Sequence, residues 1–313
     1  MAKSIPSSTP SGDIAEARPT ALAASPLRGR KQASLWGDAW KRLRRNRMAV
    51  VGLVIVVILC IVAIFAPLLA GESLDYQNYN ALYHRPELSR AYLFGADQLG
   101  RSILSRVIWG ARVSMLVGLL SQVIVVAIGV PVGAISGHFG GKTDLIIMRI
   151  VDVMYAFPQL LFVILLMSWW GRGLFNIFLA IGLTGWVTLA RLVRAQFLTL
   201  RERDYVIAAR AIGADDTRVI VKHMLPNAMT PIIVAVTFGI PAAIFTEAFL
   251  SFIGVGIGPP NTSWGVLLGE NQQYLRTYPW MLLPPAAAIS ITLLSFTFLG
   301  DGLRDALDPS MKD

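Results

Sequence analysis

Apolar residues form long uninterrupted runs from residue 48 onward, and short polar segments separate these runs. A helix needs about 20 consecutive apolar residues to cross a bilayer core of about 30 Å, so each run predicts a transmembrane helix. The predicted spans are 48–70, 113–136, 146–168, 174–194, 228–251 and 279–300. We therefore predict an all-α polytopic membrane protein with six transmembrane helices.

The third predicted span carries two charges near its start. Arg149 and Asp152 lie three residues apart, on one face of a helix. They can pair with each other or meet charges on neighbouring helices, and both arrangements make them candidates for structural ion pairing.

The composition agrees with lipid as the surrounding medium. Hydrophobic residues make up 55% of the 313 residues and charged residues only 15%, whereas soluble domains carry about 25% charged residues. The net charge of +9 fits basic cytoplasmic loops better than nucleic-acid binding. Basic residues at 41–47 precede the first span and predict a cytoplasmic amino terminus, and six spans return the carboxyl terminus to the same side. One cysteine, Cys60, excludes a disulfide framework.

The first 45 residues divide into two parts. Residues 1–34 are rich in Ser, Pro and Ala and predict a disordered cytoplasmic tail without a secretory signal. Residues 35–45 carry Trp36, Trp40 and Leu43 at helical spacing beside basic residues. This pattern predicts either an interfacial helix or a helix packed against the protein's own spans. The predicted domains are the tail at 1–34, an extension with the first span and an external loop at 35–110, a five-helix core at 111–303, and a cytoplasmic tail at 304–313.

Residues 201–227, here called the polar segment, form the most polar block in the second half of the chain. Good helix formers run from Arg201 to Ile212, and Ala208 and Ala209 present a small surface that another protein can approach closely. Gly213 is expected to end this helix, because glycine adopts left-handed backbone angles without strain.

A second helix in the polar segment is expected from Asp215 or Asp216 to about Met224, where Pro226 stops it. The result is a short helix-turn-helix that must stand in water. Spacing alone leaves two interpretations open, a cytoplasmic docking surface and a plain amphipathic linker.

Glu247 lies inside an otherwise apolar run, where an acid facing lipid would cost several kcal/mol. It either lines the translocation route or serves as a structural hydrogen-bond partner for a neighbouring helix. After the last span, Asp301 and Arg304 alternate at helical spacing. We expect them to anchor the helix end through ion pairing, and a contact with a cytoplasmic partner is the alternative.

The stretch Gly137–Thr143 is similar to a phosphate-binding loop but has three residues, not four, between Gly137 and Gly141. It also follows a predicted span and not a strand, so we predict a tight cytoplasmic turn. The spans contain no catalytic dyad and no set of metal ligands, which predicts no catalytic residue, no metal site and no enzymatic activity.

The polar segment resembles the loop that marks the membrane subunits of ABC importers. That pattern reads Glu-Ala-Ala, three residues, Gly, nine residues, Ile, one residue, Leu-Pro. Ala208-Ala209, Gly213 and Leu225-Pro226 fit the spacing, whereas Ile207 and His223 stand in place of the glutamate and the isoleucine. Other stretches are similar to the second permease of dipeptide, oligopeptide and nickel importers, and together they cover about residues 36–310: 94–106, 110–114, 148–152, 247–254 and 300–309.

This resemblance implies a type I ABC importer permease fold in a prokaryotic cell membrane. It implies that a homologous second permease, two cytoplasmic ATPase subunits and an extracytoplasmic solute-binding protein are the partners. This chain would bind no cofactor, since the ATPases use ATP and Mg. The expected substrate is a dipeptide or oligopeptide, with a nickel chelate as the alternative and an ATP-independent secondary carrier as a less favoured one. The ATPase-coupling residues implied are Tyr205, Ala208, Ala209, Arg210, Gly213, Leu225 and Pro226.

Overall fold

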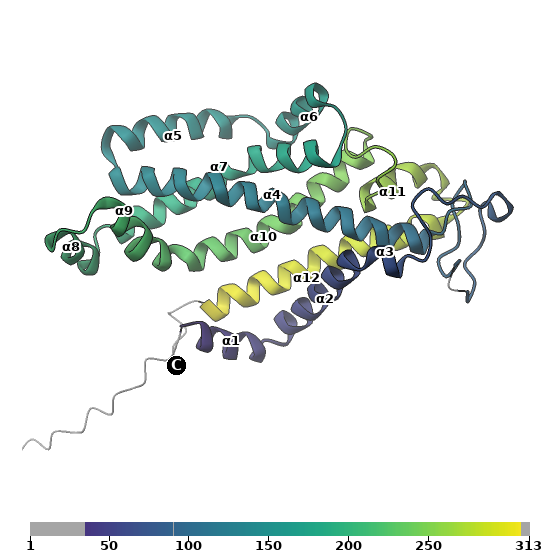
Figure 1. The fold of residues 1–313 in the computed structure, drawn as a ribbon, viewed down its shortest axis with the longest axis horizontal. Helices are drawn as coiled ribbons and strands as arrows, with labels where there is room; N and C mark the ends of the chain where they lie inside the picture. The colour runs from purple at the N-terminus through teal and green to yellow at the C-terminus, as the bar shows by residue number, and fades with distance from the viewer. Residues whose placement is uncertain (1–34, 90, 308–313) are drawn as a thin grey trace, which may run out of the picture. The chain divides into compact units, whose positions relative to one another are not determined.

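The computed structural model describes residues 35–89 and 91–307, so the tail predicted at 1–34 and the last residues of the tail predicted at 304–313 lie outside the described residues. Helices make up most of the described chain (Figure 1). In chain order the α-helices are α1 (Leu35–Arg45), α2 (Arg47–Ile64), α3 (Ala66–Leu69), α4 (Ile103–Phe139), α5 (Gly141–Ala156), α6 (Gln159–Trp170), α7 (Leu174–Leu200), α8 (Asp204–Ala211), α9 (Asp216–Arg218), α10 (Leu225–Phe252), α11 (Trp264–Asn271) and α12 (Leu283–Leu307). Shorter helical turns are η1 (Tyr79–Ala81), η2 (Val219–Met224), η3 (Gln272–Tyr274) and η4 (Pro279–Met281).

Five helical stretches of the described chain are long and apolar enough to cross a membrane. They are Arg47–Ile64, Ile103–Phe139, Leu174–Leu200, Asp216–Phe252 and Pro279–Leu307. Each contains most of one predicted span, so the apolar runs located these five helices correctly.

The span predicted at 146–168 is broken, and the prediction of one continuous helix there is wrong. α5 and α6 together are apolar enough to cross, but their axes differ by 84° at the break between them. Phe157 has extended backbone angles of φ −82° and ψ 130° and precedes Pro158. A proline ring clashes with a helical conformation in the residue before it, so the helix ends there.

The largest helix–helix interface among the described residues joins α4 to α7. Glycines at positions 129, 133 and 137 of α4 lie against the backbone of α7. A Cβ atom added at Gly129 would lie 2.9 Å from the carbonyl oxygen of Trp186, and one added at Gly137 would lie 2.7 Å from that of Arg194. A glycine every fourth residue lets two helices approach closely, as is common between membrane helices.

Helices α2 and α12 pack together; α12 also packs against α10, and α2 against α4 (Figure 1). α1 packs on the end of α12, where Ala39 and Leu43 are buried in a cluster with Ala306. Trp40 stays exposed, with the guanidinium of Arg44 over its ring at 4.8 Å. Of the two interpretations of this segment, packing against the protein's own helices therefore holds for its buried face.

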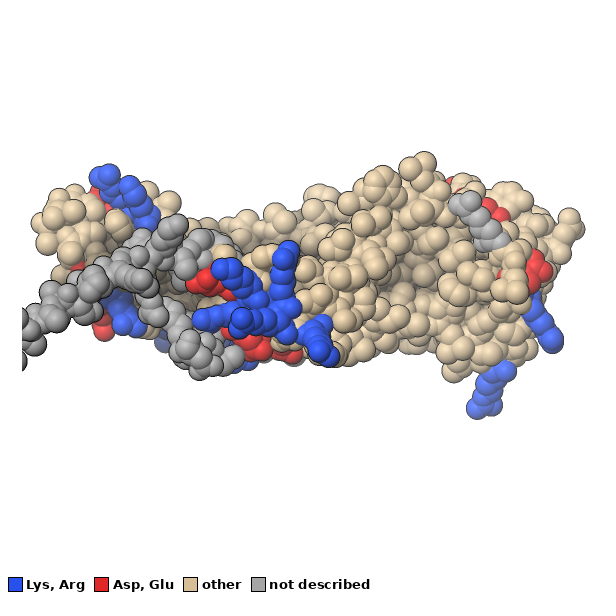
Figure 2. All heavy atoms as spheres, turned by 90° about the horizontal axis from the view of Figure 1, so that it is seen from below, with Lys and Arg blue, Asp and Glu red and all other residues tan. Residues whose placement is uncertain are grey.

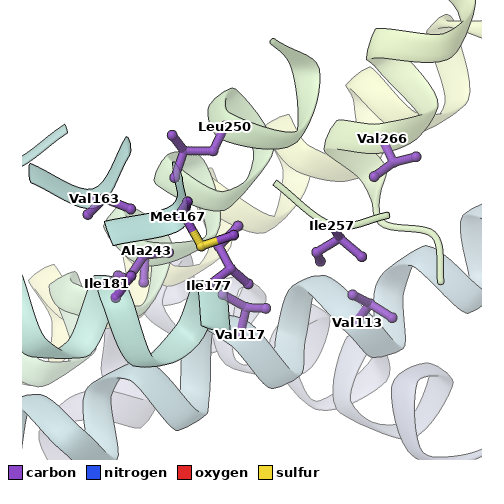
Figure 3. Packing of buried hydrophobic residues seen from close by; sticks show 11 residues of the cluster. Val113, Val117, Val163, Met167, Ile177, Ile181, Ala243, Leu250, Ile257 and Val266 are labelled. Carbon is purple, nitrogen blue, oxygen red and sulfur yellow. The ribbon is translucent and has the colours of Figure 1, made fainter. Parts of the chain in front are cut away.

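One apolar cluster packs α6, the second helix of the broken span, against the other membrane helices. Figure 3 shows side chains of α4, α6, α7 and α10 converging on Met167, which is 2% exposed. Val163, one turn earlier on α6, is fully buried in the same cluster. The second half of the broken span is thus held by packing against α7 and α10, despite its departure from the direction of α5.

Candidate functional site

The polar segment folds as a short helix, a turn and a second helical stretch. α8 begins at Asp204, three residues later than predicted, because Arg203 has extended backbone angles. It ends at Ala211, and Gly213 follows with φ +87°. The amide of Ala214 donates to the carbonyl of Ala209 at 3.0 Å across this turn. The expectation that Gly213 ends the helix is confirmed.

The prediction that Pro226 stops the second helix is wrong. α9, η2 and α10 form one continuous helical stretch, Asp216–Phe252, and Pro226 lies in the first turn of α10. η2 is a π-helix, in which the hydrogen bonds reach five residues back. This wider turn just before Pro226 accommodates a residue that lacks an N–H and whose ring clashes with the carbonyl four residues earlier. The helix therefore passes from the polar segment straight into a membrane span.

The two faces of α8 differ in exposure. Val206 and Ala209 are buried, at 0% and 5% exposed, with Val206 in a cluster that includes Val219 and Met224. Ala208 is exposed, as are Tyr205 and Ile212 at 40% and 87%. The expectation that both alanines form an open surface is therefore wrong for Ala209, which contacts its own chain. The exposed apolar residues here include Tyr205, Ile207 and Ala208 of α8 and Ile212 directly after it, and the charged Asp204 and Arg210 of α8 are exposed as well.

A buried histidine joins the polar segment to the end of α4. The imidazole of His138 lies in the last turn of α4 and is 4% exposed. Its Nε2 atom lies 2.7 Å from Oδ1 of Asp216, and its Nδ1 atom lies 3.3 Å from the sulfur of Met224. A guanidinium nitrogen of Arg210 lies 3.4 Å from Nε2 and 3.5 Å from Nδ1. One side chain of α4 thus contacts α8, α9 and η2 at once.

The other residues of the predicted coupling loop lie around this point. Leu225 is partly buried against the cluster that holds Val206, and Pro226 and Gly213 are exposed. Arg210 is exposed apart from its contact with His138. The structure brings Arg210, Asp216 and His138 together, and sequence spacing had singled out only the first of them as a site residue.

Ion pairs connect α5 to α7 near the same end. Arg194 donates to both carboxylate oxygens of Asp144, at 2.5 and 2.6 Å, and Ser136 of α4 also donates to Asp144. Asp152 pairs with Arg191 of the neighbouring helix α7 at 2.5 Å and does not pair with Arg149. Arg149 is exposed and makes no ion pair among the described residues. Gly140, with φ +63°, forms the predicted turn between α4 and α5.

Glu247 is fully buried inside the protein. Its carboxylate accepts hydrogen bonds from Ser114 of α4 at 3.2 Å and from Ser251 at 2.7 Å. Ser114 in turn accepts from the backbone N–H of Trp264 at 3.4 Å. The acid therefore connects α10, α4 and the start of α11, and it does not line the cleft described next.

A cleft of about 230 Å³ lies between α4, α6, α7 and α10. Its wall is mainly apolar, and no residue of the wall carries a charge. Its polar side chains come from all four helices: Gln122, Gln159, Thr188 and Thr246. Gly239 of α10 leaves room for the Gln122 amide, since a Cβ at 239 would overlap it. Uncharged amide and hydroxyl groups can hydrogen-bond a peptide backbone or another neutral polar group.

The opposite end of the helices carries a buried ion network. Asp97 is fully buried and accepts from Arg101 at 2.7 Å and from Arg106 at 3.0 Å. Glu270 of α11 accepts from the same two arginines, at 3.2 and 2.8 Å. The four residues fasten the loop after α3 to α4 and α11. Sequence spacing showed Arg101 and Arg106 only as charges in a long loop.

The remaining predicted residues lie on the last helix. Asp301 and Arg304 are exposed on α12, and within the described residues no ion pair joins them. The described residues also contain no group of three or more His, Cys, Asp or Glu side chains that could hold a metal ion.

A bundle of membrane-crossing helices with an uncharged internal cleft and a short exposed helix at one end defines a helical membrane transport subunit. Comparison with known proteins makes this specific. The sequence pattern of the family described as "Binding-protein-dependent transport system inner membrane component" matches residues 129–313, and that of the "N-terminal TM domain of oligopeptide transport permease C" matches residues 34–86. The chain belongs to the binding-protein-dependent transport system inner membrane components, which are permeases of the cell membrane and not enzymes.

Two relatives from Bacillus subtilis strain 168 match over nearly their whole length. The oligopeptide transport system permease protein OppC is 46% identical, over 90% of this chain and 92% of its own. The dipeptide transport system permease protein DppC is 44% identical, over 90% of this chain and 88% of its own. Among solved structures, an inward-facing MetNI methionine ABC transporter superposes with a TM-score of 0.54 at 18% identity, over 65% of this chain and 96% of its own. The fold is that of a type I ABC importer permease.

Proposed function

We propose that this chain is one of two permease subunits of an ATP-driven, binding-protein-dependent importer of dipeptides or oligopeptides. The observation that carries the proposal is α8, a short helix with an exposed apolar face that is joined to the membrane helices on both sides and anchored to the end of α4. Such a helix fits a groove on a partner protein, since apolar side chains at helical spacing are the usual anchors.

The end of the molecule that carries α8 is assigned to the cytoplasm. Figure 2 shows Lys and Arg side chains gathered toward the end where α1 and α8 lie. Lys41, Arg44, Arg45 and Arg47 are exposed there, beside the start of the first span. An excess of basic residues next to spans favours the cytoplasmic side, and the proposal therefore includes a cytoplasmic location for both ends of the described chain.

The partner for α8 is an ATPase subunit, which hydrolyses ATP with Mg. Ile207, where related loops carry a glutamate, is 55% exposed beside Ala208. The contact therefore relies on apolar shape and not on an ion pair. A homologous second permease completes the translocation route.

The substrate assignment rests on the cleft and on the relatives. An uncharged wall with two glutamine amides suits the peptide backbone, which is common to peptides of every sequence. The relatives at 44–46% identity carry oligopeptide and dipeptide names, which favours peptides over nickel chelates.

Reconstitution tests the proposal. Proteoliposomes containing this chain, the second permease, the ATPases and the binding protein should accumulate a labelled tripeptide only with hydrolysable ATP, and should not accumulate radioactive nickel. Accumulation that continues without the ATPases, driven by an ion gradient, would make the chain a secondary carrier and contradict the proposal.

A further inference from the structure

His138 occupies a position that the packing of the membrane helices alone does not explain. It lies in the last turn of α4, yet its hydrogen-bond partners lie 72 to 86 positions later in the chain. Among the described residues, every hydrogen bond between α4 and residues 204–224 goes through this one side chain. α8 is otherwise joined to the bundle by the chain itself and by the buried Val206 and Ala209.

The geometry at the imidazole identifies the strong contact. At 2.7 Å from a carboxylate oxygen, Nε2 carries the proton and donates to Asp216. The Arg210 nitrogen is almost equidistant from the two ring nitrogens, at 3.4 and 3.5 Å, so its contact with the ring is longer than that of Asp216 and is not directed at one nitrogen. Asp216 of α9 and Arg210 of α8 therefore both contact the imidazole ring of His138, which belongs to α4.

The turns on both sides of α8 are exposed, and the hydrogen bonds that close them join neighbouring backbone groups. Gly213 has no atom within 4 Å of the place where a side chain would begin, and residues 201–203 form a short turn with exposed side chains at 202 and 203. A helix pulled by a partner can rotate at both turns, unless a side contact ties it to the body that must move. α4 is part of that body, because it contributes Gln122 and Val125 to the cleft and packs along α7.

We propose that His138 is the positioning residue through which movement of α8 reaches α4. Its ring contacts Arg210 of α8 and Asp216 of α9, so that a displacement of α8 by the ATPase passes through Arg210 to α4 and reorients the cleft. This inference rests on the proposed function, because it assumes that an ATPase moves α8.

The test compares two substitutions at one position in the complete reconstituted transporter. Peptide uptake and ATP hydrolysis are measured on the same vesicles, and the ATP consumed per peptide is the readout. We expect His138→Ala to raise this ratio about tenfold, since a hydrogen bond to a charged group is lost. His138→Gln, whose amide still donates to Asp216, should stay within about twofold of the wild type.

Two further variants separate positioning from mere stability. Asp216→Ala should also raise the ratio, and the double variant should be no worse than His138→Ala alone, because that substitution already removes the contact with Asp216. Asp215→Ala, an exposed neighbour whose side chain makes no capping hydrogen bond, should leave the ratio unchanged. A residue that only stabilised the fold would lower uptake and hydrolysis in proportion.

The outcomes are distinct. If the wild type shows no ATP-driven uptake, the proposed function fails. If the wild type is coupled and His138→Ala keeps the wild-type ratio, or lowers both rates in proportion, the inference is overturned while the function stands. Equal uncoupling by His138→Ala and His138→Gln would also overturn it, because the hydrogen bond would then not be the link.

Discussion

Replacing Asp97 with alanine should destabilise the end of the molecule opposite α8. Asp97 is fully buried and accepts four hydrogen bonds, from the backbone amides of Leu99 and Arg101 and from the side chains of Arg101 and Arg106. Removing one partner of a buried ion pair costs about 3–5 kcal/mol. Glu270 still binds both arginines and offsets part of this, so we expect a loss of about 3 kcal/mol in the free energy of unfolding.

The assay is SDS-induced unfolding of the detergent-solubilised chain, followed by tryptophan fluorescence. Asp75→Ala is the matched control, because Asp75 is an exposed acid in the same loop, and it should change the free energy by less than about 0.5 kcal/mol. Asp97→Asn should fall between the two, since the amide oxygen still accepts from the backbone while the charge is lost. If Asp97→Ala has the same free energy of unfolding as Asp75→Ala, the ion network does not stabilise the protein and the reasoning fails.

Three further predictions concern the membrane helices and the polar segment. Gly133→Leu should separate α4 from α7 and cost about 2 kcal/mol in the same unfolding assay, whereas Gly173→Ala, with no atom closer than 3.8 Å, should cost little; equal effects would contradict the packing argument. Glu247→Gln should keep peptide uptake within about twofold, because the amide oxygen still accepts from one serine and the amide NH2 can donate to the hydroxyl oxygen of the other; a complete loss of uptake would instead give the acid a direct role. Gly213→Pro should abolish ATP-driven uptake with normal membrane insertion, because proline cannot adopt φ +87°; normal uptake would show that this turn does not matter.

The sequence predicted the parts of the fold that depend on local physics. Apolar runs located five of the membrane helices, because a helix that crosses a bilayer must be both long and apolar. Gly213 ends α8 because the turn requires a positive φ. Prolines were harder to interpret. Pro158 breaks a helix within a run that hydropathy alone treats as continuous, whereas Pro226, which looked like a stop, begins a long helix after a π turn.

The contacts between distant residues could not be predicted from spacing. His138 and Asp216 are 78 positions apart, and Arg101 and Glu270 are 169 apart. In the sequence, Asp216, Arg101 and Glu270 are ordinary charged residues and His138 is a single histidine in a predicted turn, so nothing indicates that they pair. Ala209 illustrates the same limit within a single helix, because which side of α8 faces the protein depends on where η2 places Val219 and Met224. Ser114, which donates to Glu247, likewise lies 133 positions away from it in the chain.

The central claim, that the exposed face of α8 couples this permease to an ATPase, is tested most directly at Ala208. An Ala208→Glu variant places a charge on that face without disturbing the buried side of the helix. ATP-driven peptide uptake by the reconstituted transporter should fall at least about tenfold, since a charge would be desolvated in an apolar contact, and the ATPases should no longer co-purify. Wild-type uptake with the ATPases still bound would contradict the account.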